Sequence, residues 1–246
     1  FACNLVVNKI TDKEKKELNL SSLDLLLLGA EPIKHTTLKN FTQTFASCGL
    51  KKQALYPCYG LAEATLSVSG SLKKDTPIFL SLEKNSLKQN LVKEPDKGET
   101  NFIVAGSGRP LPKEKLLIVD SNTLEKCPDK EIGEIWVQGP NIAKGYWNNP
   151  EQTKETFHAY LADTGEGPFL RTGDLGFIKD RELFITGRLK DLIIIRGKNH
   201  YPQDIELTVE QSYPAFRHGC SAAFSVDVQN EEQLVIVQEI KSDYIN

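Results

Sequence analysis

The 246-residue chain has no methionine, only two tryptophans and four histidines, and no apolar run long enough to cross a bilayer. A membrane-spanning helix needs about 20 largely apolar residues in succession, so the sequence predicts no membrane insertion. The first residues have neither a basic segment nor a small-residue cleavage site, and we expect no secretory signal. The missing methionine and the apolar start at Phe1 favour a piece of a longer protein, although methionines lost from the written sequence would look the same.

Charge and cysteine content exclude several classes of protein. A formal net charge of −3 gives no reason to expect a nucleic-acid partner or a binding surface for membranes. The five cysteines are scattered without a CxxC pair, which indicates reduced thiols in a cytoplasmic protein rather than a disulfide framework or a zinc site. The histidines also lack metal-binding spacing. With 39% apolar and 26% charged residues, the sequence predicts a globular protein of one or two domains.

The first part of the chain follows the pattern of an α/β protein. Residues 25–28 are all leucine and stop at Gly29, as expected of a buried strand. Residues 36–46 have the apolar spacing of a helix, and residues 53–57 predict a second strand that leads into a turn at Tyr59-Gly60. Strand, helix and strand in this order predict a parallel sheet whose ligand lies at the carboxyl ends of the strands.

The amino-acid composition changes after residue 68. Residues 69–106 are rich in lysine and polar residues and predict an inserted surface segment. Several short strands separated by aspartate and glycine turns follow this segment, and they predict a small barrel or sandwich. These strands are residues 115–120, 133–138, 169–178 and 182–186. Two later strands, residues 219–226 and 233–240, are predicted outside this barrel, near the end of the chain. Pro150 and Pro202 begin helices that we expect to reach Ala159 and Ser212.

Two adjacent motifs contain residues suited to a nucleotide. Arg171-Thr172-Gly173-Asp174 ends in a carboxylate that can accept hydrogen bonds from both hydroxyls of a ribose. Arg188, fourteen positions later, offers a guanidinium fork that fits ribose and phosphate oxygens. The alternatives are an ordinary β-turn at Asp174 and an exposed ion pair of Arg188 with Asp191 or Asp180.

A third motif, Tyr59-Gly60-Leu61-Ala62-Glu63, lies upstream. An aromatic face such as that of Tyr59 can stack on adenine, and the Glu63 carboxylate is a suitable oxygen ligand for Mg²⁺. Core packing of Tyr59 and a solvated helix start at Glu63 are the alternatives. Gly29-Ala30-Glu31-Pro32 lies at the end of the first predicted strand, and by itself this segment is weak evidence for a nucleotide site.

Together these motifs resemble the adenylate-forming superfamily of acyl-CoA synthetases, peptide-synthetase adenylation domains and luciferases. The segment GRLKDLIIIRGKNHYPQDIE, from Gly187 to Glu206, matches nearly all of one superfamily signature. The resemblance implies binding of ATP or AMP and of Mg²⁺, with Glu63 as the magnesium ligand. It implies catalytic roles for Glu63 and Arg188 and a domain hinge at Lys190. The residues implied to bind the nucleotide are Gly29, Ala30, Glu31, Tyr59, Gly60, Asp174 and Arg188.

Two features resemble the fatty-acyl-AMP ligase branch of this superfamily. Many relatives have threonine where this chain has Ala62, and the segment near residues 77–101, which returns through Gly108-Arg109-Pro110, resembles an insertion of that branch. The insertion is associated with passing the acyl group to an acyl carrier protein rather than to coenzyme A. A tolerated surface loop is the alternative, because long insertions carry little entropic penalty. The block that contains Trp136 and Trp147 is interpreted as barrel structure, with both tryptophans in the core.

The resemblance also predicts the domain organisation. Residues 1–189 would be the C-terminal portion of an AMP-binding domain, with a parallel sheet layer and a distorted β-barrel. Residues 190–246 would begin a smaller, mobile α+β subdomain. The implied function is ATP-dependent activation of a fatty acid as acyl-adenylate for an acyl carrier protein. An acyl-CoA ligase, a peptide-synthetase adenylation domain and a catalytically inactive nucleotide-binding or carrier-docking module are the alternatives. The phosphate-binding loop and the adenylation lysine would lie outside this chain, so we expect the chain alone to be inactive.

Overall fold

The computed structural model describes residues 2–96, 101–195, 198–228 and 231–244. Its first half contains the predicted parallel unit: β1 (Leu26–Leu28) lies beside β2 (Leu55–Leu61), and α3 (His35–Phe45) connects them. Leu26 pairs with Leu55 and Leu28 with Pro57. β3 (Leu66–Gly70) and β6 (Arg109–Pro110) extend this sheet in antiparallel directions. The predicted strand–helix–strand order is therefore confirmed, and the mixed α/β fold class with it.

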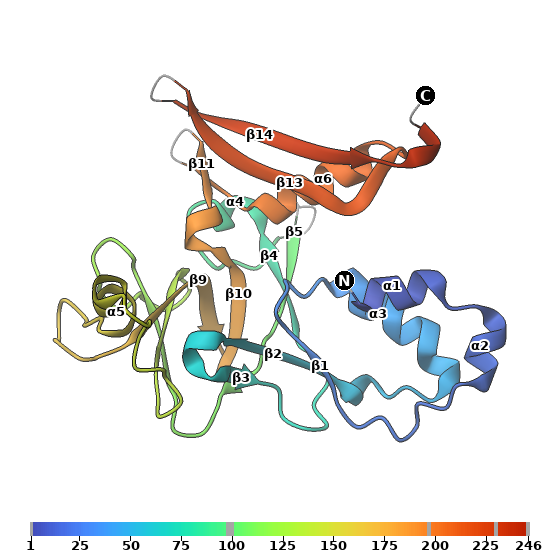
Figure 1. Cartoon of the computed structure of the whole chain (residues 1–246), viewed down its shortest axis with the longest axis horizontal. Helices are drawn as coiled ribbons and strands as arrows, with labels where there is room; N and C mark the ends of the chain where they lie inside the picture. The colour runs from blue at the N-terminus through green and yellow to red at the C-terminus, as the bar shows by residue number, and fades with distance from the viewer. Residues whose placement is uncertain (1, 97–100, 196–197, 229–230, 245–246) are drawn as a thin grey trace.

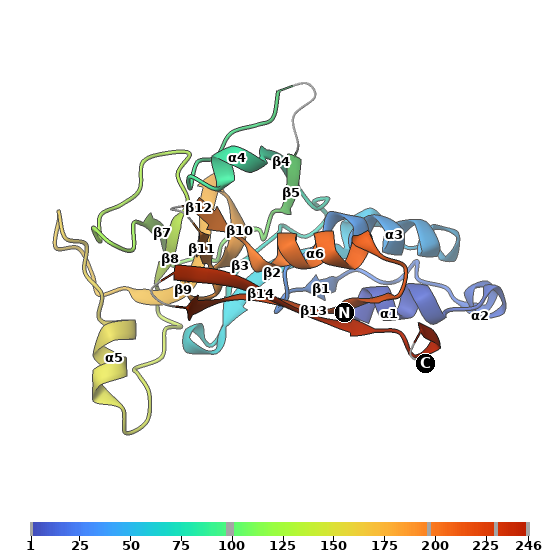
Figure 2. The same ribbon diagram turned by 90° about the horizontal axis from the view of Figure 1, so that it is seen from above.

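The helices at the N-terminus pack beside this sheet (Figures 1 and 2). α3 buries Leu38, Phe41 and Phe45, which share one face because they are three, four and seven positions apart. α1 (Ala2–Lys9) lies against α3, and α2 (Asp12–Glu17) begins at a capping box. Three short 3₁₀ helices follow in this half: Ala46–Cys48, Lys52–Ala54 and Ala62–Ala64.

The predicted turn at Tyr59-Gly60 is wrong. Both residues belong to β2, which continues to Leu61, and the chain reverses only at the 3₁₀ helix Ala62–Ala64. A glycine is needed at position 60 because the strands approach closely: a Cβ there would lie 1.5 Å from the carbonyl oxygen of Leu66. The glycine therefore marks a close strand contact rather than a turn.

The middle of the chain forms an antiparallel sheet in the order β10-β9-β8-β7. Its strands are β7 (Lys115–Val119), β8 (Gly133–Gln138), β9 (Leu170–Lys179) and β10 (Glu182–Arg188). These bounds agree closely with the predicted strands, which are short apolar stretches between turns rich in aspartate and glycine. α5 (Pro150–Phe157) begins with Pro150 in its first turn, after the cap Asn149, as predicted.

The two tryptophans have different environments. Trp136 in β8 is fully buried, as expected of a core residue. The prediction that Trp147 lies in the core is wrong, because its side chain is 92% exposed. The preceding residue, Tyr146, packs edge-on against Phe157 with ring centroids 5.1 Å apart, and Trp147 lies in the loop that leads into α5.

The lysine-rich segment is not simply a surface loop. It contains β4 (Phe79–Glu83), the short helix α4 (Lys84–Leu87) and β5 (Asn101–Ala105), and β4 pairs with β5. Their apolar side chains share a core cluster with Phe177 and Phe184 of the antiparallel sheet. The expectation of a surface segment over residues 69–106 is therefore wrong in its middle, where alternating apolar residues stand among the lysines. Residues 97–100 of the proposed insertion lie outside the described residues.

The last part of the chain forms a hairpin and a helix at one end of the molecule (Figure 1). After the 3₁₀ helix Leu189–Asp191 come β11 (Ile193–Ile195) and β12 (Lys198–His200), then α6 (Pro202–Ser212). β13 (Phe216–Val228) and β14 (Glu231–Ile240) pair in antiparallel directions and end at the 3₁₀ helix Ser242–Tyr244. The predicted helix from Pro202 and the two predicted strands are confirmed, and Gly197 of the motif lies outside the described residues.

Hydrogen bonds join this last part to the preceding sheet and to the inserted segment. Gln203 donates through Nε2 to the carbonyl oxygen of Thr186 at 2.7 Å, and Asn199 donates through Nδ2 to Oδ1 of Asn90 at 2.9 Å. Within the described ranges, no helix has the length and apolar character to cross a membrane. All five cysteines are unpaired.

Candidate functional site

Asp174 lies between two side chains that come from different strands. Tyr59 of β2 donates its phenolic hydroxyl to Oδ2 of Asp174 at 2.6 Å, and Arg188 of β10 donates from Nε to Oδ1 at 3.1 Å. The side chain of Asp174 is 15% exposed and that of Arg188 is 67% exposed. The cluster thus has a nearly buried carboxylate at its centre and a cation that remains accessible to a ligand.

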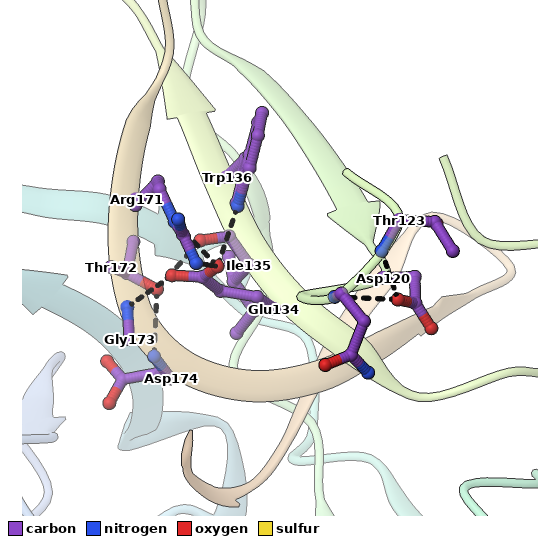
Figure 3. Close-up of polar contacts among 10 residues, drawn as sticks. Asp120, Thr123, Glu134, Ile135, Trp136, Arg171, Thr172, Gly173 and Asp174 are labelled. Carbon is purple, nitrogen blue, oxygen red and sulfur yellow. Dashed lines mark hydrogen bonds and ion pairs between the residues drawn. The ribbon is translucent and has the colours of Figure 1, made fainter. Parts of the chain in front are cut away.

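A bulge in β9 presents Asp174. Trp136 of β8 pairs with Arg171 and Glu134 pairs with Leu175, so Thr172, Gly173 and Asp174 all lie opposite Ile135. The hydroxyl of Thr172 donates to the carbonyl oxygen of Ile135 at 2.7 Å and accepts from the backbone N–H of Asp174 at 3.1 Å. Figure 3 shows β9 bending through these residues. Bulges often re-aim side chains beside functional sites.

Arg188 reaches Asp174 because β10 also has a register shift. Ile185 pairs with Gly176 and Gly187 pairs with Leu175, which leaves Thr186 as the extra residue and sets Arg188 directly opposite Asp174. The alternative of an ion pair between Arg188 and Asp191 or Asp180 is therefore not what the structure has, because the ion pair of Arg188 is with Asp174.

Burial alters the acid–base properties of the cluster. Desolvation raises the pKa of Asp174, although the hydrogen bond from Tyr59 and the charge of Arg188 oppose this change. Desolvation, together with the neighbouring Asp174 charge, also raises the pKa of Tyr59 far above its ordinary value. Tyr59 is therefore a hydrogen-bond donor at neutral pH. Tyr59 as a whole residue is 9% exposed, so in this structure it packs in the core and also contacts Asp174.

The turn after β1 lies next to the end of β2. Gly29 and Ala30 are exposed, and Ala30 has a φ of 64°, in the left-handed region. A Cβ at Gly29 would lie 3.0 Å from the carbonyl oxygen of Cys58, the residue before Tyr59. Leu28 pairs with Pro57, so the turn of Gly29, Ala30 and the exposed Glu31 begins beside Cys58, directly before Tyr59 in β2.

Glu63 lies in the 3₁₀ helix after β2. Its carboxylate accepts a hydrogen bond from the hydroxyl of Tyr146 at 2.8 Å, and its carbonyl oxygen accepts from Ala143 at 2.8 Å. No group of three or more potential metal ligands among His, Cys, Asp and Glu occurs in the described ranges. Magnesium sites beside phosphates often use only one or two carboxylates, with waters and phosphate oxygens as the other ligands. A single carboxylate at Glu63 is compatible with such a site.

Two further residues complete the comparison with the sequence. Lys190 is exposed in the 3₁₀ helix Leu189–Asp191, directly after Arg188 and Leu189. Glu134 is a buried carboxylate that contacts the Asp174 bulge, and the motifs in the sequence did not predict a role for it. The signal that could have found it is a glutamate inside an otherwise apolar strand, since buried charges require partners.

A parallel β1–α3–β2 unit whose strand ends lie beside an acidic and a basic side chain is typical of α/β proteins that bind nucleotides. The family model described as AMP-binding enzyme matches residues 2–147. The chain belongs to this family.

Its relatives include ligases of fatty acids. The chain is 49% identical to the medium-chain-fatty-acid–[acyl-carrier-protein] ligase JamA of Moorena producens, over 99% of the chain and 42% of that protein. It is 41% identical to FadD21 of Mycobacterium tuberculosis, named as a fatty-acid–CoA ligase, over 98% of the chain and 41% of that protein. The chain thus spans about two fifths of the length of these relatives.

Solved structures agree with this relationship. A structure from a study of fatty acyl-adenylate ligases of E. coli and L. pneumophila matches with a TM-score of 0.86 and 32% identity, over 98% of this chain and 42% of that one. The L. pneumophila fatty acyl-adenylate ligase in complex with acyl adenylate and pyrophosphate matches with a TM-score of 0.76 and 40% identity, over 100% and 43%.

Proposed function

We propose that this chain is part of an enzyme that uses ATP to activate a fatty acid as its acyl-adenylate and passes the acyl group to an acyl carrier protein. The observation that carries the proposal is the Tyr59–Asp174–Arg188 cluster at the strand ends of an AMP-binding fold. The names of JamA and of the L. pneumophila ligase support the fatty acid as substrate, and the name of JamA supports the carrier protein.

In this reaction the main task of the protein is to position its substrates. An oxygen of the fatty carboxylate attacks the α-phosphorus of ATP, a new P–O bond forms, and the bond to the β-phosphate breaks to release pyrophosphate. Asp174 would accept hydrogen bonds from the ribose hydroxyls, and Arg188 would bind ribose or phosphate oxygens. Holding the two reactants in line, together with nearby cationic charge, supplies most of the acceleration in such a transfer.

Other residues of the cluster would surround the adenine and ribose. Gly29, Ala30 and Glu31 would line one side of the nucleotide and Tyr59 with Gly60 the other, as their adjacent positions after β1 and in β2 suggest. Glu63 would hold Mg²⁺ through its carboxylate together with phosphate oxygens, where the ion neutralises phosphate charge. The hydrogen bond from Tyr146 supports this role because it orients the Glu63 carboxylate.

The proposed choice of acceptor rests on the inserted segment. Asn199 binds the carbonyl oxygen of Lys88 and the side chain of Asn90, so the insertion contacts the part of the chain that follows Lys190. Lys190 would be the hinge about which that part moves between the two half-reactions. Contacts that hold the part after Lys190 against the insertion would keep it from reaching the arrangement in which coenzyme A can accept the acyl group. The five unpaired cysteines support a cytoplasmic location.

A product assay tests this proposal. The full-length protein is incubated with ATP, Mg²⁺, a series of fatty acids and either an acyl carrier protein or coenzyme A, and the products are identified by mass spectrometry. We expect acyl-adenylate and acylated carrier protein. Accumulation of acyl-CoA instead would favour the second candidate, an acyl-CoA ligase, which the name of FadD21 supports.

A further inference from the structure

Glu134 is a buried carboxylate that makes four contacts beside the candidate site. Its side chain is 2% exposed. Oε2 accepts hydrogen bonds from Nε1 of Trp136 at 2.9 Å and from Nε of Arg171 at 3.0 Å, and Nη2 of Arg171 lies 2.8 Å from the same oxygen. Oε1 accepts from the backbone N–H of Gly173 at 3.1 Å. Figure 3 shows this side chain pointing from β8 toward the bend of β9, while Asp174 points away from it.

These contacts stabilise the bulged backbone of residues 172–174, which the regular pairing of β8 with β9 does not hold. Because Thr172, Gly173 and Asp174 bulge out opposite Ile135, Gly173 has no register partner in β8, and its N–H donates to the side chain of Glu134. Gly173 has a φ of 71°, and apart from Gly173 itself and its two chain neighbours no heavy atom lies within 4 Å of the position that a Cβ would occupy. Packing around that position therefore does not hold the bend.

We infer that Glu134 is a positioning residue for nucleotide binding: by accepting from both Arg171 and Gly173 it fixes the bend that aims Asp174 at the ribose. This inference rests on the proposed role of Asp174. Glu134 itself contacts neither Asp174 nor the face where the nucleotide would lie, so it acts through the backbone. A neutral amide at position 134 would keep the shape but would lose the charge-assisted bonds to Arg171.

The test uses the full-length protein and the dissociation constant for AMP, measured by isothermal titration calorimetry, with three variants: Glu134→Gln, Asp174→Asn and the double variant. We expect Glu134→Gln to raise the dissociation constant about tenfold, as expected for the loss of hydrogen bonds to a charged group. The double variant should bind no more weakly than Asp174→Asn, because Glu134 acts through Asp174. Additive losses would overturn the inference, since independent sites add.

A matched control separates positioning from general stability. Glu182 is another buried carboxylate of the same sheet, and it accepts from the backbone N–H of Gly108 at 2.8 Å, away from the bulge. Glu182→Gln should lower the melting temperature as Glu134→Gln does, but should leave the dissociation constant for AMP unchanged. Equal weakening of AMP binding by both variants would indicate a merely structural role and overturn the inference.

Two further outcomes keep the inference testable. If Glu134→Gln does not fold, Trp136→Phe removes one donor to Glu134 while keeping an aromatic ring in the core, and it should raise the dissociation constant by a smaller factor in the same direction. An unchanged value would overturn the inference. If Asp174→Asn leaves AMP binding unchanged, the proposed function fails; if only Glu134→Gln is without effect, the positioning role alone fails.

Discussion

The hydroxyl of Tyr59 donates a 2.6 Å hydrogen bond to Asp174, a residue 115 positions away in the sequence. The contact joins the mixed β1–β2–β3–β6 sheet to the antiparallel sheet, so the candidate site lies where the two sheets meet. Arg188 approaches the same carboxylate from the neighbouring strand β10. A site that depends on three strands should respond strongly to changes in any one of these side chains.

Asp174→Asn in the full-length protein should lower kcat/KM for ATP by about two orders of magnitude, because the charged group proposed to accept two ribose hydrogen bonds is replaced by an amide. ATP–pyrophosphate exchange is the measurement. Asp180→Asn is the matched control: Asp180 lies in the exposed turn between β9 and β10, with a φ of 52° that asparagine also tolerates. Equal rates for wild type and Asp174→Asn would favour a catalytically inactive binding module.

Binding of AMP should weaken as the pH falls through the pKa of Asp174, because the ionised carboxylate is the better acceptor for ribose hydroxyls. Burial raises this pKa, so the loss should begin at a higher pH than for an exposed aspartate. The hydrogen bond from Tyr59 lowers the pKa of Asp174, so Tyr59→Phe should raise it further and move the loss of binding to higher pH.

Calorimetric titration of AMP between about pH 4 and pH 8 measures this shift, a window that covers ordinary and raised carboxyl pKa values. Tyr213→Phe serves as the control, because Tyr213 is more than half exposed in a distant part of the chain. A pH profile of Tyr59→Phe that coincides with that of the wild type would show that the Tyr59 hydroxyl does not tune Asp174.

Gly60→Ala should destabilise the protein by about 3 kcal/mol or more, which is large for a single methyl group. The added Cβ would lie 1.5 Å from the carbonyl oxygen of Leu66, so β2 and β3 would have to separate. Gly165→Ala is the comparison: it has a φ of 68° but open space around the new Cβ, and should lose only about 1–2 kcal/mol. Urea unfolding of both variants gives the two free energies.

Asn199→Ala should allow acyl-CoA to form in the full-length enzyme, because it removes the side-chain contact between β12 and the insertion. Asn90→Ala removes the other partner of the same hydrogen bond and should have the same effect, with no further gain in the double variant. Mass spectrometry of the products measures the acyl-CoA yield. The exposed Asn122→Ala is the control, and a yield of acyl-CoA from Asn199→Ala no higher than from Asn122→Ala would contradict the prediction.

Local patterns in the sequence predicted many of the elements that surround the site. The leucines before Gly29, the spacing of Leu38, Phe41 and Phe45, and the prolines that begin α5 and α6 each act over a few residues, and the structure has the predicted elements there. Such patterns work because side chains that share one face of a helix or strand are set by its period. They failed at the inserted segment, where lysines obscured the alternation of Leu80 and Leu82, both partly or fully buried.

By itself, the sequence determined the family, the strand–helix–strand order of the parallel unit, the strands of the antiparallel sheet, and the types of side chain available for a nucleotide, since motifs of Asp174, Arg188 and Tyr59 can be read locally. Only the tertiary structure decided which of these side chains meet. Arg188 pairs with Asp174 rather than Asp191 because register shifts in β9 and β10 set them opposite each other. The role inferred for Glu134 also depends on such a shift, because strand register is set by pairing across the whole sheet and not by any short stretch of the chain.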